Sequence, residues 1–543
     1  MLRTWHWVAV GIASFLVLPA YAQKKSSGRG TEAIVGTLLE DVDSLNTITS
    51  GHTRDIGTLK QKTDELADKV GPGTLEAIAP VTKDVELLKA DVSELKREVA
   101  GLKALIDKGA KKLFWMTPIF QIRIRPEYQR NRIDVSSDAK DQDLYYLQRL
   151  RFGLAVEPIK GVRGVAVAQD SRLWGTENPV AGRDATVSND NNLDLHEGYV
   201  LLYDLFTPGL EVQSGRFEMQ FGEGRQIGRN NWGNVGRSFD GARIGYRMAD
   251  TFRIDAFGAV IRDVPPLVVS SQPVATQIGV GGGPAATLTD MNLYGLYATV
   301  DVWKPLTGDI YGLYVHDDKT ADASRIGTVG ARLVAKPVAG LTIEGEAAVQ
   351  FGVRDTRDPT GRVIEADHLA TAYHLDASYE IPVAMSPSFG IFFDSASGDA
   401  DPTDDSSVRY EPVFPTRHAK YGLMDNFSWQ GIWVVGPTFR MKPHPTVGIR
   451  LDYRYFGLST DGGTIRAFEG TTTFAPGGSK AIGHEFDITA DWQAMEWLRF
   501  ELGYGVFAPG AATEGATATV GGVTRVLGGD AAHFVYFQTT LGI

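Results

Sequence analysis

The sequence of 543 residues contains no cysteine, which excludes disulfide bonds and thiolate metal sites. Beyond its first residues it also lacks any run of about 18 apolar residues, so no membrane-spanning helix is expected. The opening stretch MLRTWHWVAVGIASFLVLPAYAQ has the short apolar core and the small residues of a secretory signal peptide. We therefore predict an exported protein, with residues 1–22 forming the signal peptide and cleavage after Ala22.

Lysine is scarce in the larger part of the chain. Residues 114–543 contain 30 arginines and 8 lysines, whereas residues 24–112 contain 12 lysines. Arginine carries a planar and permanently charged donor group that fits carboxylates and phosphates. The preference for arginine is therefore local to the larger part of the chain, although the formal net charge of the whole chain is −12.

The segment from 31 to 112 has the apolar spacing of a coiled coil. One heptad frame precedes the sequence GPG at 71–73 and a second follows it, with β-branched residues and leucine at the a and d positions. We predict a periplasmic coiled coil over 31–112 with a break near 71–80. A single amphipathic helix packed on a domain is the alternative. The partners expected for the coiled coil are further copies of the chain or peptidoglycan.

From Phe114 onward, apolar and polar residues alternate with a period of two, as in FQIRIRPEY at 120–128. This alternation predicts β-strands. The strand-like runs are joined alternately by short connections, such as AKPVAG, and by long ones, such as residues 395–426. Short turns on one rim and long loops on the other are typical of outer-membrane β-barrels. We predict an all-β fold over 114–543, a transmembrane antiparallel barrel of about 18 strands (16–18).

The polar positions of these strands are rich in arginine and in acidic residues. In a barrel they face the lumen, while their apolar neighbours face lipid and lipopolysaccharide. One interpretation is a lattice of paired charges that braces the barrel, and the other is an electropositive path for an anion. Four arginines on neighbouring strands have few acids beside them and suit a path best: Arg123, Arg125, Arg149 and Arg151. Other positions predicted to face inward are Arg172, Arg253, Arg332, Arg440, Glu127, Asp170, Asp255, Glu344, Glu346, Asp376, Asp452, Glu485 and Asp487.

The stretch GRNNWGNVGRSFDGARIGYR at 228–247 gathers arginines around one turn. We predict a long outer loop up to Phe239, with Trp232 as a packing anchor, followed by a strand. Its arginines are expected to divide between the mouth of the barrel and the lumen wall, with Asp240 pairing one of them. The mouth residues are Arg225, Arg229 and Arg237, and the wall residues are Arg243 and Arg247. The complete set of candidate substrate-binding residues is Arg123, Arg125, Arg149, Arg151, Arg172, Arg225, Arg229, Arg237, Arg243, Arg247, Arg450 and Arg454.

Several stretches, taken together and in order, resemble the alginate-export family of outer-membrane barrels. They are IRIRPEYQRN, YYLQRLRFGL, VAVAQDSRLWG, SGRFEMQFGEGRQIGRNNWGNVGRSFDGARIGY, FFDSASGDADPTDD, EPVFPTRHAKYGLMDNFSWQG, GHEFDITADW and GYGVFAPG. The resemblance implies a monomeric barrel of about eighteen strands whose arginine-rich lumen passes a uronate polymer outward. The coiled coil is not part of the family pattern and is similar to the stalks of porins that trimerise or contact peptidoglycan.

Little in the sequence points to catalysis. The histidines have neither the HExxH pattern nor a triad-like spacing, and GVGGGP lacks the lysine of a phosphate-binding loop. SNDNNLDLHEG resembles a calcium loop but lacks glycine at the sixth position. SGDADPTDD is expected to be a solvated acidic loop, with a loop calcium as the weaker alternative. The residues concerned are Asp190, Asn192, Asp194, Asp399, Asp401, Asp404 and Asp405. We therefore predict no enzyme and no cofactor.

Together these features predict an outer-membrane channel, a porin or exporter, that passes an anionic saccharide or another small anionic solute. A stalked trimeric anion porin is one alternative. A structural barrel that tethers the outer membrane to the cell wall is another, and both depend on the heptad segment. No nucleic-acid partner is expected.

Overall fold

The computed structural model describes residues 115–137, 142–175, 191–249, 251–261, 291–303, 305–317, 323–358, 360–520 and 522–542. It also describes seven separate positions of the N-terminal segment, all helical: Gln61, Ala90, Ser93, Glu94, Lys96, Arg97 and Ala100. Contacts divide the chain into two units, Met1–Thr117 with Ile543, and Pro118–Gly542. Apart from those seven positions, the predicted signal peptide and coiled coil lie outside the described residues and stay predictions. Within the described part of the chain, no helix is long and apolar enough to cross a membrane.

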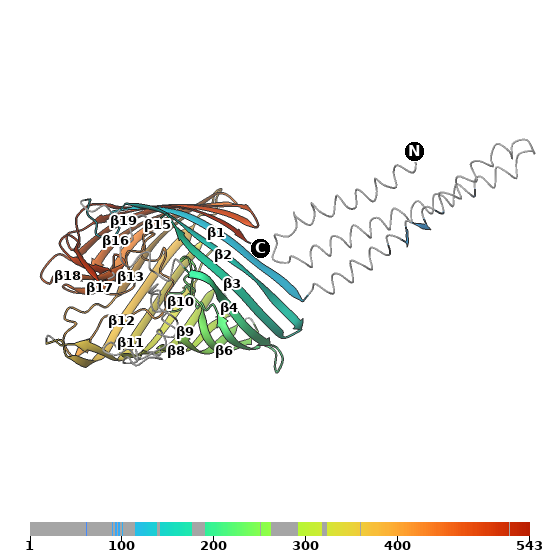
Figure 1. The fold of residues 1–543 in the computed structure, drawn as a ribbon, viewed down its shortest axis with the longest axis horizontal. Coiled ribbons are helices and arrows are strands. Elements are labelled where there is room, and N and C mark those ends of the chain that lie inside the picture. Colours follow the sequence, from blue (N-terminus) through green and yellow to red (C-terminus); the bar gives the residue numbers. More distant parts are fainter. Residues whose placement is uncertain are drawn as a thin grey trace, which may run out of the picture. The chain divides into compact units, whose positions relative to one another are not determined.

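The second unit is a closed β-barrel (Figure 1). Its main sheet has 19 strands, of which β14 (Ser406–Ser407) only pairs in parallel with two residues of β12. The other eighteen pair antiparallel in chain order, and β1 closes the ring against β23. They are β1 (Met116–Arg130), β2 (Asp143–Ile159), β3 (Val162–Trp174), β4 (Asn191–Tyr203), β5 (Leu210–Phe217), β6 (Phe239–Met248), β7 (Phe252–Ile261), β8 (Met291–Trp303), β9 (Leu306–Asp317), β10 (Ser324–Ala335), β11 (Leu341–Arg357), β12 (Val363–Glu380), β13 (Ser388–Ala396), β15 (Ile432–His444), β16 (Val447–Leu458), β19 (Ala481–Met495), β20 (Leu498–Pro509) and β23 (Ala532–Gly542). The predicted fold class is confirmed.

The two rims of the barrel differ in their connections. Two residues join β2 to β3 and β15 to β16, whereas residues 218–238 join β5 to β6 and residues 397–431 join β13 to β15. We call these rims the turn rim and the loop rim. Gln121 of β1 pairs with Gly542 of β23, so the strands that begin and end the barrel meet at the turn rim.

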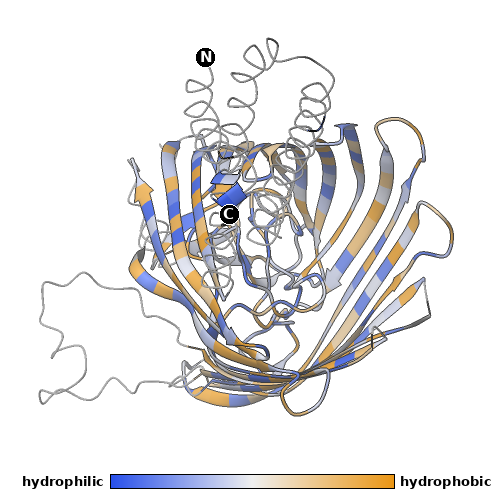
Figure 2. Cartoon of the chain, turned by 90° about the vertical axis from the view of Figure 1, so that its right-hand side faces the viewer, coloured by the Kyte–Doolittle hydropathy of each residue, from blue (hydrophilic) through white to orange (hydrophobic). Residues whose placement is uncertain are grey.

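Alternate residues of each strand face opposite sides of the wall, as expected for a barrel in lipid. Ile124, Phe152 and Ile244 are 45%, 42% and 54% exposed on the outside, while Arg125 and Arg149 are 2% and 1% exposed on the inside. Figure 2 shows the resulting alternation of hydrophilic and hydrophobic residues along the strands. The predicted faces of these strands are confirmed.

The faces of β3 are the reverse of those predicted. Val165 and Val167 are buried and belong to one inner cluster, and Gln169 is 3% exposed on the same side. Asp170 and Arg172 therefore face outward, where they pair with each other at 2.7 Å. The prediction that both point inward was wrong because β3 has valine on its inner face and alanine on its outer face. The polarity pattern alone therefore does not show which face of β3 points into the lumen.

At the loop rim, further strands extend from the connections. They form a separate four-stranded sheet of β17 (Gly463–Ala467), β18 (Gly470–Phe474), β21 (Thr517–Val520) and β22 (Val523–Val526). Buried aromatic residues beneath this sheet, such as Phe427, Phe456, Phe468 and Phe507, form the largest hydrophobic cluster of the described residues. This cluster joins the 397–431 connection to the barrel wall, and Figure 2 shows chain segments inside the ring of strands.

Candidate functional site

Two long connections meet inside the barrel and narrow it. We call residues 218–238 the first loop and residues 397–431 the second loop. Three backbone hydrogen bonds of 2.6 to 2.8 Å join residues 224–228 of the first loop to residues 414–416 of the second. Two of them form an isolated parallel bridge between Ile227 and Phe414, which lie in segments that are far apart in the chain. The two loops therefore act as one partition within the lumen.

The wall arginines of β1 and β2 hold the first loop. Arg123 donates to the carbonyl oxygens of Asn231 at 2.7 Å and Gly233 at 3.0 Å. Arg149 donates to the same two oxygens at 3.2 and 3.4 Å, and Arg151 to the oxygen of another loop residue at 3.3 Å. Buried guanidinium groups need such acceptors. These arginines lie side by side as predicted, but they face a loop backbone rather than open water.

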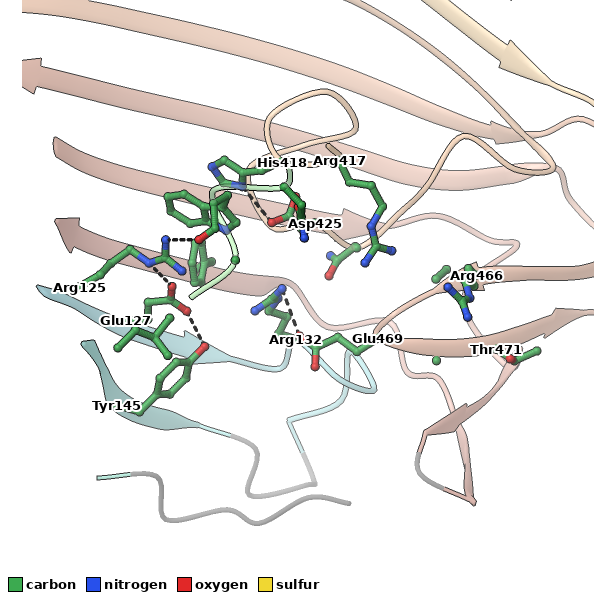
Figure 3. Close-up of a pocket in the computed structure, with 18 of the residues that line it drawn as sticks. Arg125, Glu127, Arg132, Tyr145, Arg417, His418, Asp425, Arg466, Glu469 and Thr471 are labelled. Carbon is green, nitrogen blue, oxygen red and sulfur yellow. Dashed lines mark hydrogen bonds and ion pairs between the residues drawn. The ribbon is translucent and has the colours of Figure 1, made fainter. Parts of the chain in front are cut away.

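Arg125, Trp232 and His418 form a stack that crosses from the wall to both loops. The Arg125 guanidinium carbon lies 3.5 Å from the centre of the Trp232 ring. On Trp232 the ring of His418 is stacked with centroids 3.5 Å apart and planes 4° apart. His418 Nδ1 is 2.9 Å from Asp425 Oδ2, and Arg125 pairs with Glu127 at 2.5 Å (Figure 3). The prediction of Trp232 as a packing anchor is confirmed.

Arg225, in the first half of the first loop, lies deep in the barrel. It is 8% exposed and donates to Asp394 of β13 at 3.0 Å and to Tyr421 of the second loop at 3.3 Å. Its other terminal nitrogen is 2.9 Å from His374 Nε2 of β12. The prediction that Arg225 lies at the mouth was wrong, because the first loop turns inward and Arg225 packs against β12 and β13.

The second loop is held by carboxylates of β19. Glu485 accepts a hydrogen bond from the backbone nitrogen of Met424 at 3.0 Å, and Asp487 accepts one from Leu423 at 3.1 Å. Both carboxylates are nearly inaccessible to solvent. Arg454 of β16 pairs with Asp487 and donates to a carbonyl oxygen of the loop at 2.9 Å. Arg454 is thus an inward residue, as predicted, and its contacts fix the loop.

Three cavities lie around this partition. The loop-side cavity has a volume of about 830 Å³, the middle cavity about 390 Å³ and the turn-side cavity about 710 Å³. Arg417, Arg466 and Thr471 line both the loop-side and the middle cavity. His418 lines both the middle and the turn-side cavity. The shared residues place the smallest cavity between the two larger ones, at the level of the stack.

Basic groups outnumber acids toward the loop rim. The loop-side cavity is lined by six arginines and three carboxylates, and the middle cavity by four arginines and three carboxylates. The turn-side cavity is lined by six lysines and arginines against six carboxylates. The excess of positive charge therefore lies in the part of the lumen that begins at the loop rim and ends at the stack.

Arg417 and Arg466 contribute most directly to this excess. Both are exposed to the lumen, and Figure 3 shows them at the same cavity. Within the described ranges, no ion pair or side-chain hydrogen bond ties either guanidinium group to a partner. Two unpaired cations at the junction of two cavities form a place where a passing anion gains attraction without displacing a protein carboxylate.

Lys420 is the corresponding cation of the turn-side cavity. Burial, with a smaller contribution from nearby Arg225, lowers the pKa of Lys420 to about 8. The lysine is therefore mostly protonated at pH 7 and loses its charge in mildly alkaline solution. Its charge therefore changes within the ordinary range of pH.

The remaining loop arginines are held more locally. Arg229 is half exposed and lies 3.7 Å from Glu218. Arg237 donates to three loop carbonyl oxygens at 2.6 to 3.0 Å, and burial lowers its pKa to about 10.

Asp240 pairs with Arg216 at 2.9 Å. The prediction that Asp240 pairs one of the arginines between 225 and 247 was wrong, because Asp240 and Arg216 are register partners on β6 and β5.

The wall arginines on β6 and β16 face inward, as predicted. Arg243 is 3.7 Å from both Glu211 and Asp255, and Arg450 pairs with Asp452 at 2.7 Å. Arg247 is exposed near the turn rim, where its register partner is Arg253. Most of the candidate arginines thus belong to the charge lattice that braces the barrel.

The sequence pattern did not predict Arg417, His418, Lys420 and Arg466 as candidate site residues. The first three lie together in PTRHAKYG, within a stretch already recognised as matching the family. The available signal was a cluster of three basic residues between a proline and a glycine. Such a cluster is notable in a barrel segment with few lysines, and it could have indicated a binding site. Nothing in the sequence placed that loop inside the barrel.

The acidic residues considered for calcium have other roles in the structure. Asn192 and Asp194 lie in β4 rather than in a loop, and Asp190 lies outside the described residues. Asp399, Asp401 and Asp404 each accept hydrogen bonds from turn amides. Among the residues that the structure describes, no group of three or more His, Cys, Asp or Glu is placed to hold a metal ion.

A closed barrel of eighteen strands, with an apolar outer face and a charged lumen narrowed by inward loops, defines an outer-membrane channel. The family model described as alginate export matches residues 114–522, and the chain belongs to the alginate export family. No curated protein matches the chain.

Several solved structures of similar barrels match most of the chain. OccK8 (OprE) of Pseudomonas aeruginosa has 11% identity and a TM-score of 0.47 over 78% of this chain and 98% of its own. OprD of the same organism has 10% identity and a TM-score of 0.46 over 78% and 94%. OccK2 (OpdF) in complex with glucuronate, also from P. aeruginosa, has 8% identity and a TM-score of 0.47 over 79% and 98%. The family assignment depends on none of these values.

Proposed function

We propose that the protein is a passive outer-membrane channel for an anionic saccharide or a small anionic solute, with Arg417 and Arg466 as its selecting cations. The observation that carries this proposal is their position. They are unpaired within the described chain and line the junction of the loop-side and middle cavities. A carboxylate that reaches this junction meets two forked donors with no competing protein acid bound to them.

The arrangement of cations along the lumen favours passage of the solute over tight binding. Conduction requires contacts that are attractive enough for a solute to enter and weak enough for it to leave. Two free guanidinium groups followed by His418 and Lys420 supply successive weak contacts along the lumen. The wall arginines are less available to the solute, since their terminal nitrogens already donate to loop carbonyls, to Gln121 and to Glu218, and Arg125 pairs with Glu127.

The orientation in the membrane follows from the rims. Long loops of outer-membrane barrels face the outside and short turns face the periplasm. The loop-side cavity is then the outer vestibule, and the segment before β1 lies in the periplasm. A trimeric porin or a tether to the cell wall would depend on the coiled coil, which lies outside the described residues.

Reversal potentials in planar bilayers test the proposal. The double substitution Arg417→Gln and Arg466→Gln is expected to lower the anion-to-cation permeability ratio several-fold, while the single-channel conductance persists. Arg172→Gln is the matched control, because it removes an arginine from the outer face of β3. An anion preference unchanged in the double variant, or equally reduced in the control, would contradict the proposal.

A further inference from the structure

The segment 426–428 of the second loop carries two buried polar side chains on either side of a core phenylalanine. Phe427 packs against Phe456 and Phe507 in the largest hydrophobic cluster of the described residues. Asn426 and Ser428 are 1% and 3% exposed, yet Asn426 lines the middle cavity and Ser428 lines the loop-side cavity. Both polar side chains are therefore enclosed by protein atoms and still reach the lumen.

The amide of Asn426 has no hydrogen-bond partner among the residues that the structure describes. Neither its oxygen Oδ1 nor its nitrogen Nδ2 is paired, and the same holds for the hydroxyl group of Ser428. Buried polar atoms are normally hydrogen-bonded, because leaving them without a partner destabilises the folded protein. An asparagine that presents an acceptor and a donor to a cavity is available to a ligand that supplies both complements.

The backbone fixes Asn426 beside the four-stranded sheet at the loop rim. Its carbonyl oxygen accepts a hydrogen bond of 2.9 Å from the nitrogen of Phe468, and Phe427 forms a bridge with Ala467. Phe468 and Glu469 make the turn between β17 and β18, with positive φ angles of 49° and 62°. Such angles are unfavourable for residues other than glycine, and the buried ring of Phe468 holds the turn in this conformation. The position of Asn426 relative to the sheet is thus well defined.

Two threonines of this sheet line the same cavity as Asn426. Thr471 of β18 and Thr519 of β21 are paired in register, and both are exposed. Figure 3 shows Thr471 near Arg466, its register partner on β17. A threonine hydroxyl group can donate one hydrogen bond and accept others. The middle cavity therefore presents one amide and two hydroxyl groups on the side that carries Arg466.

We propose that Asn426, Thr471 and Thr519 form a binding site, which we call the diol site, for two hydroxyl groups on neighbouring carbon atoms of the solute. One hydroxyl donates to Oδ1 of Asn426 and its neighbour accepts from Nδ2, because the two oxygens of a vicinal diol are spaced to match the oxygen and nitrogen of a carboxamide. This inference rests on the proposed function and adds a contact to the uncharged part of the solute. Since none of the three side chains is charged, the diol site also binds an uncharged diol.

Two uncharged isomers test for the diol site. In cis-1,2-cyclohexanediol the hydroxyl groups are on neighbouring carbons, whereas in cis-1,4-cyclohexanediol they are at opposite ends of the ring. Each isomer is titrated against single channels in a planar bilayer, and the concentration that halves the chloride current is measured. The 1,2 isomer is expected to act at a concentration about fivefold lower, as one additional hydrogen bond would give.

Variants of the diol site locate the effect. Asn426→Leu is expected to abolish the difference between the isomers without lowering the thermal unfolding temperature, because the amide has no described protein partner to lose. Thr471→Val, on a different element, should reduce the difference if the first variant fails to fold. Thr473→Val is the matched control, since this threonine is exposed on the same strand and lines none of the three cavities.

Three results would overturn the inference. They are equal half-blocking concentrations of the two isomers in the parent protein, a difference that survives in both site variants, and a difference that is lost equally in the control. A lower unfolding temperature in Asn426→Leu together with an intact difference in Thr471→Val would also overturn it, because the amide would then hold the loop rather than the solute.

The outcome is separable from that of the proposed function. If the isomers block equally while the Arg417 and Arg466 double variant loses anion preference, the channel selects anions and only the diol site is disproved. If the 1,2 isomer blocks more strongly and the double variant keeps its anion preference, the diol site stands and the selecting role of the two arginines is disproved.

Discussion

Trp232 of the first loop lies flat against His418 of the second, with ring centroids 3.5 Å apart and planes 4° apart. The other face of the indole is covered by the Arg125 guanidinium group at 3.5 Å. Both faces of the ring are therefore occupied by protein, and Trp232 cannot serve as a stacking platform for a sugar. Trp232 joins the barrel wall to both loops at the smallest of the three cavities.

Replacing Trp232 by alanine should loosen this junction. Stacked aromatic pairs contribute about 0.5–1.5 kcal/mol beyond the area that they bury, and a cation over the ring adds about as much. We expect higher conductance and greater open-channel noise in Trp232→Ala, with little change in the thermal unfolding of the barrel. Single-channel recordings provide the measurement, and Trp174→Ala, at an exposed site on β3, is the control. Equal noise in both variants would contradict a role for the stack in fixing the loops.

The wall arginines should behave differently from the lumen arginines. Arg123 and Arg149 both donate hydrogen bonds to the carbonyl oxygens of Asn231 and Gly233. The double variant Arg123→Gln and Arg149→Gln is therefore expected to change loop order more than charge selectivity. We predict unstable conductance levels with a permeability ratio nearer that of the parent than that of the Arg417 and Arg466 double variant. A larger loss of selectivity from the wall pair would reverse the assignment of roles.

Anion preference should fall as the solution becomes alkaline. The pKa of Lys420 is lowered to about 8, so its positive charge is present below that pH and lost above it. Reversal potentials measured between pH 7 and 9 are expected to show a declining preference for anions. Lys420→Arg should keep the preference constant across this range, because arginine stays charged. Lys420→Gln should give a lower and equally constant value, and a persistent pH slope in both variants would assign the effect to another group.

The sequence predicts the strands of the barrel wall better than it predicts the residues that line the lumen. Strand alternation is a local pattern, and it correctly placed residues such as Arg125, Arg243 and Asp487 on the inner face. It failed for Arg172, because β3 carries apolar residues on both faces, valine on the inner one and alanine on the outer one. The inward fold of the loops depends on contacts between residues nearly 200 positions apart, such as Arg225 with Tyr421. No local periodicity records such contacts, so Arg417 and Arg466 could not be identified as the exposed cations.

Glu485 of β19 is a buried carboxylate whose substitution tests what holds the second loop in place. Glu485 accepts a hydrogen bond from Met424, and the oxygen of a glutamine could accept the same bond. Glu485→Gln is therefore expected to retain the loop, whereas Glu485→Leu leaves the amide of Met424 without its acceptor, at a cost of about 1–3 kcal/mol.

The chain has no cysteine, so a single cysteine introduced at Leu423 reports on the loop without background labelling. Leu423 is 3% exposed in the parent. Its labelling by a water-soluble maleimide should be slow in the parent and in the glutamine variant and several-fold faster in the leucine variant. Equal rates in all three would show that Asp487 and Arg454 hold the loop without Glu485, and faster labelling in both variants would show that the negative charge itself is required.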